Sequence, residues 1–145
     1  MKQASAESQF FRAMERFSEV VTPAALYQSV LGYRRIKEYF AEDSAWVAKS
    51  MIQEGEILKV LDQNTEAKKI LASVSLNYRQ YRREAARAEL KCATLSGIPI
   101  TERIRVCEQT INTYPELSSV VAEGWIILGD LYRELGENGL SFSAY

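Results

Sequence analysis

One stretch decides the fold of this chain: Val121-Ala122-Glu123-Gly124-Trp125-Ile126-Ile127-Leu128-Gly129-Asp130-Leu131-Tyr132. Trp125, Leu128 and Tyr132 share one face of a helix because their spacing follows the helical repeat. Gly129 lies beside that face, where the absence of a side chain lets a partner helix approach. We therefore expect Trp125 to be buried between two helices. Gly136 then ends the helix, since glycine accepts the left-handed conformation of a helix C-terminus.

The rest of the chain is also predicted to be helical. Apolar residues recur three or four positions apart in every long segment, and no segment alternates apolar and polar residues as a strand does. The expected helices cover about residues 4–21, 23–41, 44–61, 66–95, 101–114 and 119–135, and a seventh begins within 138–145. The sequence thus predicts an all-α fold, an antiparallel bundle or array of six to seven helices.

Two segments leave alternatives open. Residues 66–95 form either one long helix or two helices in line, with a break near Ser75–Asn77. Gly55 either breaks the helix of residues 44–61 or only weakens it. Further along, the apolar face of residues 101–114 is expected to pack against the helix that carries Trp125, because a short connection favours antiparallel neighbours. That face consists of Ile104, Cys107, Ile111 and Tyr114.

The opening stretch resembles the first helix of a tetratricopeptide repeat in four positions, Trp125, Leu128, Gly129 and Tyr132. The resemblance extends over residues 84–145 and implies TPR-like helical hairpins. It assigns Ser141 to the small position early in the second helix and Tyr145 to the aromatic position after it. Such repeats bind proteins or peptides and do not catalyse reactions. The alternative is an amphipathic core helix in an ordinary bundle.

The preceding repeat matches the pattern less well. Its last positions are Tyr114-Pro115, as the resemblance requires, but four others depart from it. These are Arg87 for the tryptophan, Lys91 for the glycine, Thr94 for the tyrosine and Arg103 for the small residue. A third and still weaker match to the repeat covers residues 45–71 and starts near Trp46.

We expect one domain made of two parts that pack together. Residues 1–64 form an N-terminal segment of about three helices, and residues 65–145 form the TPR-like segment. The chain reads as the N-terminal portion of a longer helical-repeat protein, because its last residues do not resemble a polar capping helix. The alternative is a complete small protein whose tail packs back as a short turn.

Composition narrows the classes of function. The 145 residues carry a net charge of −1, with no histidine and two cysteines, Cys92 and Cys107. Without histidine the chain lacks the commonest general base and metal ligand. We predict no catalytic residue, no metal, no cofactor and hence no enzyme, and we interpret both cysteines as buried structural thiols. The lack of a signal peptide or an apolar membrane span predicts an intracellular protein, cytoplasmic or nuclear, without a membrane partner.

The candidate binding residues fall into two groups. The first is a basic segment that suits carboxylate or phosphate groups and contains Arg79, Tyr81, Arg82, Arg83 and Arg87, with most of its arginines on one side of a helix. The second group contains the exposed positions that the resemblance assigns to the binding groove, Ile126, Asp130 and Arg133. We interpret the chain as a non-enzymatic scaffold or adaptor for a protein or peptide partner. The alternatives are a nucleic-acid-binding helical protein that uses the basic face and a self-assembling homo-oligomer.

Overall fold

The structure is a computed structural model that describes residues 5–19 and 22–137. Within these residues the chain forms helices and no strand, so the predicted all-α fold is confirmed. The helices are α1 (Ala6–Glu19), α2 (Pro23–Tyr39), α3 (Ser44–Val60), α4 (Asn64–Asn77), α5 (Arg82–Cys92), α6 (Ile100–Thr113) and α7 (Ser118–Glu137). The helix expected to begin within 138–145 lies outside the described residues.

The segment predicted as one long helix, or as two in line, is instead a hairpin. Helix α4 ends at Asn77, α5 begins at Arg82, and the two helices pack against each other. Tyr78 leaves the helical conformation, with φ −125° and ψ 39°, and the Tyr81 N–H donates to the Tyr78 carbonyl at 3.0 Å. The three- and four-residue spacing continues across this turn because each helix has its own apolar face.

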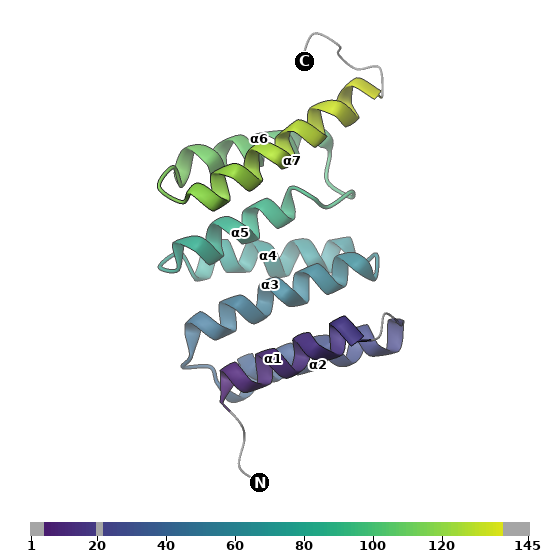
Figure 1. Ribbon diagram of the computed structural model, residues 1–145, viewed down its shortest axis with the longest axis vertical. Helices are drawn as coiled ribbons and strands as arrows, with labels where there is room; N and C mark the ends of the chain where they lie inside the picture. The colour runs from purple at the N-terminus through teal and green to yellow at the C-terminus, as the bar shows by residue number, and fades with distance from the viewer. Residues whose placement is uncertain (1–4, 20–21, 138–145) are drawn as a thin grey trace.

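The helices form an elongated stack with α1 and α7 at opposite ends (Figure 1). Each helix packs on the next in sequence. Helices α1, α3, α5 and α7, called the odd row here, also pack on one another in turn. In the described part of the chain no two of α2, α4 and α6, the even row, pack together. The odd-row helices therefore form a continuous layer, whereas the described even-row helices do not contact one another.

Helices α3 and α5 run parallel and in register. Three polar contacts join them or the residues that directly follow α5, and each links positions 35 residues apart. They are Lys49–Glu84, Glu56–Lys91 and Lys59–Thr94. A constant offset means that the chain returns to an equivalent place after one helical hairpin.

The core has two apolar clusters. The first joins α1, α2, α3 and α4 with part of α5 and the connection after it, around Tyr33, Ile57 and Leu71. The second joins α5, α6 and α7 around Leu90, Cys107 and Leu128. The predicted packing of the 101–114 face on α7 is confirmed, because Ile104, Cys107 and Tyr114 lie in this second cluster and Ile111 packs against it.

The expected burial of Trp125 is wrong. The side chain is 59% exposed, because α7 turns a different face to α6. That buried face consists of Val120, Gly124, Leu128 and Leu131. A Cβ built at Gly129 meets no described atom within 4 Å, and the second helix expected to approach Gly129 lies in residues 138–145, outside the described residues. Gly124 makes a close approach to α6, with Ile111 Cγ1 2.8 Å from a Cβ built on it.

Gly55 does not break α3, which is continuous from Ser44 to Val60. A Cβ at Gly55 would lie 2.7 Å from the Cγ and Cδ2 atoms of Leu71 on α4. The missing side chain therefore lets α3 and α4 pack closely.

Candidate protein-binding surface

A row of basic side chains runs along one side of α5. Arg83, Arg87 and Lys91 are four residues apart, which places them on neighbouring turns of one helix face. Lys91 reaches toward α3 and α7, where its Nζ lies near carboxylates of both helices. This face of α5 therefore lies between α3 and α7 within the odd row. We call Arg83, Arg87 and Lys91 the α5 strip.

The charges of the α5 strip are only partly neutralised. Within the described residues Arg83 and Arg87 have no ion-pair or hydrogen-bond partner, and Arg83 is exposed while Arg87 is half-buried. Lys91 Nζ lies 3.7 Å from Glu56 Oε2 and 3.9 Å from Glu123 Oε1. By contrast, Lys49 of α3 donates to Glu84 of α5 at 2.6 Å beside the strip. Two guanidinium groups and one loosely held ammonium group therefore face outward.

The predicted single basic face is wrong, because the structure divides its residues. Arg79 and Tyr81 lie in the turn before α5, and Arg82 is the first residue of the helix. Successive residues of a helix point roughly 100° apart, so Arg82 diverges from Arg83. Arg82 turns instead toward the end of α6, where its Nε donates to Glu116 at 2.7 Å and an Nη donates to the Thr113 carbonyl at 3.2 Å.

Arg79 and Arg82 border a cavity of about 330 Å³ between the ends of α4 and α6. The Arg82 guanidinium lies 4.8 Å from the centre of the Tyr114 ring. Inside, Glu89 Oε2 is buried and has no hydrogen-bond partner among the described residues. Burial raises the pKa of the Glu89 carboxyl, while the nearby Thr110 hydroxyl and the charge of Arg79 act in the opposite direction. The remaining lining residues are Ser75, Leu76 and Thr113.

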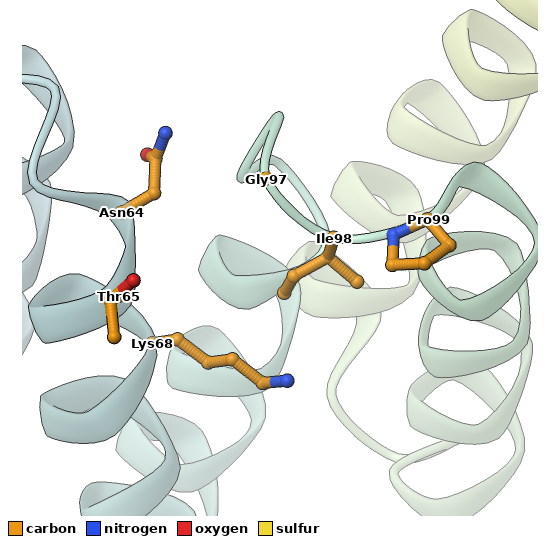
Figure 2. Close-up of a pocket in the computed structure, with 6 residues that line it drawn as sticks. All are labelled: Asn64, Thr65, Lys68, Gly97, Ile98 and Pro99. Carbon is orange, nitrogen blue, oxygen red and sulfur yellow. The ribbon is translucent and has the colours of Figure 1, made fainter.

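A second pocket of about 260 Å³ lies where the start of α4 meets the connection from α5 to α6 (Figure 2). Figure 2 shows the Lys68 side chain extended toward Ile98, with Pro99 beyond it. Lys68 is the one ionisable residue among the six that line the pocket. A Cβ built at Gly97 would lie 3.4 Å from Asn64 Cβ, so a methyl group there would reach van der Waals contact with the start of α4. This pocket holds no acid–base pair for proton transfer.

The three groove positions predicted on α7 are all exposed. Ile126 is 67% exposed and adjoins Trp125. Asp130 and Arg133 bind each other, with Arg133 Nη1 2.9 Å from Asp130 Oδ1. Sequence reasoning missed Lys91 as a member of the basic surface, although it continues the four-residue spacing of Arg83 and Arg87.

The two thiols are poor nucleophiles. Both cysteines are free, and burial raises the pKa of Cys92 and of Cys107 to about 11. A thiol with so high a pKa is almost fully protonated near neutral pH. Among the described residues no three acidic or cysteine side chains gather as they would around a metal ion. In the same residues no helix has the length and apolar character to cross a membrane.

Comparison with known proteins gave no matching family model, no similar curated protein and no similar solved structure.

Proposed function

We propose that this protein is a non-enzymatic scaffold that binds an acidic segment of a partner protein along the α5 strip. The observation that carries the proposal is the pair of unpartnered guanidinium groups, Arg83 and Arg87, beside the loosely held Lys91. Arginine offers forked donors that bind a carboxylate through two hydrogen bonds. A helical segment with carboxylates four residues apart would match the spacing of the strip.

The charges around the strip favour a protein segment over a nucleic acid. Glu56, Glu84 and Glu123 flank it on α3, α5 and α7. A nucleic acid carries a continuous line of phosphates, which these carboxylates would repel. A protein segment can place its few carboxylates on the strip and neutral residues elsewhere. The net charge of −1 adds no general attraction for phosphate.

Resemblance to tetratricopeptide repeats supports the same proposal. Those repeats are pairs of helices with a period of 34 residues, close to the offset of 35 between α3 and α5. Gly55 and the buried Ala67 stand twelve positions apart, as the resemblance expects of Gly129 and Ser141. In the hairpin of α5 and α6, Lys91 and Arg103 stand at the two positions where the resemblance expects small residues. Helices α5 and α6 also pack less extensively than α3 and α4 do.

Charge-neutralising variants test the proposal. The double variant Arg83→Gln, Arg87→Gln should weaken binding of a fluorescein-labelled peptide that carries glutamate at every fourth position. We expect about a tenfold loss, because charged hydrogen bonds contribute about 1.5–3 kcal/mol each when well formed and less when exposed. The dependence of binding on salt should flatten as well. Glutamine preserves helix propensity, so the circular dichroism spectrum should stay unchanged.

The matched control is Arg35→Gln, Arg105→Gln, which removes two exposed arginines from α2 and α6. It changes the net charge equally and should bind the peptide as the parent does. Equal affinities of the two double variants would contradict the proposal. Stronger binding of the parent to single-stranded RNA than to the peptide would favour the nucleic-acid alternative instead.

A further inference from the structure

Lys91 is the cation that three helices of the odd row share. It belongs to α5, and its Nζ lies between Glu56 Oε2 of α3 and Glu123 Oε1 of α7. Its side chain is 22% exposed, so solvent and a ligand can still reach it. The two carboxylates therefore lie beside the third cation of the α5 strip.

Both contacts of Lys91 are long. At 3.7 Å and 3.9 Å they exceed the length of a charged hydrogen bond, and they hold Lys91 by charge attraction alone. The neighbouring Lys49–Glu84 pair, also between α3 and α5, is 2.6 Å long. Glu56 Oε1 is moreover buried without a hydrogen-bond partner among the described residues. Lys91 is thus the least firmly bound cation among the ion pairs of this face.

We propose that Glu56 and Glu123 are internal competitors that occupy Lys91 until an acidic partner displaces them. This inference rests on the proposed function, because it concerns the same strip. A partner carboxylate can bind Arg83 and Arg87 without displacing any group. At Lys91 it must compete with two carboxylates of the protein itself. The two glutamates therefore lower the affinity of the protein for any acidic segment. Lys91 then binds only a partner carboxylate that is placed well enough to displace them.

The test compares glutamine variants at the two competing positions. Glu123→Gln is the main variant because Glu123 is partly exposed and its loss should not disturb folding. We expect it to bind the peptide with glutamate at every fourth position about two- to five-fold more tightly, because partly exposed ion pairs contribute only modestly. Glu56→Gln should shift affinity in the same direction. Fluorescence anisotropy measures both shifts.

Two further variants isolate the effect. Glu108→Gln removes the same charge from an exposed position on α6 and should leave affinity unchanged. Lys91→Met keeps an apolar stem of similar length, and in its presence Glu123→Gln should no longer tighten binding. This double-mutant cycle separates a local competition from a general change in net charge.

The outcomes separate the inference from the proposed function. If Glu123→Gln and Glu56→Gln bind as Glu108→Gln does, while the Arg83, Arg87 double variant still weakens binding, the inference is wrong and the proposed function stands. If the arginine double variant has no effect, or the parent fails to bind the peptide, both are wrong. If Glu123→Gln still increases the affinity for the peptide when Lys91→Met is present, the inference is also wrong, because the glutamate would then act on a group other than Lys91.

Discussion

At the scale of single residues, Glu89 shows how burial controls a charge. Its Oε2 atom is enclosed without a partner, and burial raises the pKa of the carboxyl above the ordinary value. The folded state therefore binds a proton more readily than the unfolded chain. By linkage, the contribution of Glu89 to stability increases as pH falls through its folded-state pKa, and it decreases as pH rises.

Glu89→Gln tests this directly. At about pH 7 the variant should unfold at a higher urea concentration than the parent, because glutamine carries no charge into the cavity. The difference should shrink at a lower pH, because the raised pKa lets the parent's Glu89 take up a proton and become neutral as well. Urea midpoints of both proteins at the two pH values measure it. A difference that is constant or that widens on acidification would show that Glu89 is adequately solvated or paired.

The identity and spacing of residues alone could not show which of them are buried. The spacing of Trp125 and Leu128 predicts that they share a helix face, but Leu128 is buried and Trp125 is exposed. The two residues lie about 60° apart around the helix axis, enough to place one in the contact with α6 and the other outside it. Which side of a helix meets its neighbour depends on the position of the neighbour, and that is not local information.

At the scale of helices, Gly55 and Gly129 differ in how closely another helix approaches them. Alanine at Gly55 would place its Cβ 2.7 Å from the buried Leu71 side chain, so crowding should destabilise the fold by about 1–3 kcal/mol. Alanine at Gly129 meets no described atom within 4 Å and should stabilise α7, since alanine exceeds glycine in helix propensity by about 1 kcal/mol. Denaturant midpoints of Gly55→Ala and Gly129→Ala should thus move in opposite directions. A loss of stability for Gly129→Ala would instead mean that a helix packs there, as the sequence pattern alone suggests.

Helix positions were largely predictable because their ends carry local signals. Thr22 accepts the Ala25 N–H at 3.2 Å and Pro23 opens α2, as their residue types predict. The turn between α4 and α5 carries no proline or glycine, so the apolar spacing indicated at most a break near Ser75–Asn77 and not a reversal of the chain. That missed turn also explains the error in the basic surface. With a continuous helix Arg79 would lie one turn before Arg83 on the same face, whereas in the structure Arg79 borders a separate cavity.

At the scale of the whole molecule, three charged contacts follow one another along the odd row. Lys49–Glu84, Glu56–Lys91 and Lys91–Glu123 connect α3, α5 and α7 along one face. The all-α array was predictable from composition and periodicity, but this alignment of charges was not. It arises because α3 and α5 are in register at an offset of 35 residues, which pairs side chains far apart in sequence.

Hydrogen–deuterium exchange tests the central claim most directly, because it locates a bound segment without any substitution. The protein is compared with and without a saturating amount of the peptide that carries glutamate at every fourth position. We predict slower amide exchange in α5, with smaller effects in the facing parts of α3 and α7, and unchanged exchange in α2 and α6. Peptide bound with protection on the even row, or on the Trp125 side of α7, and none in α5 would contradict the account.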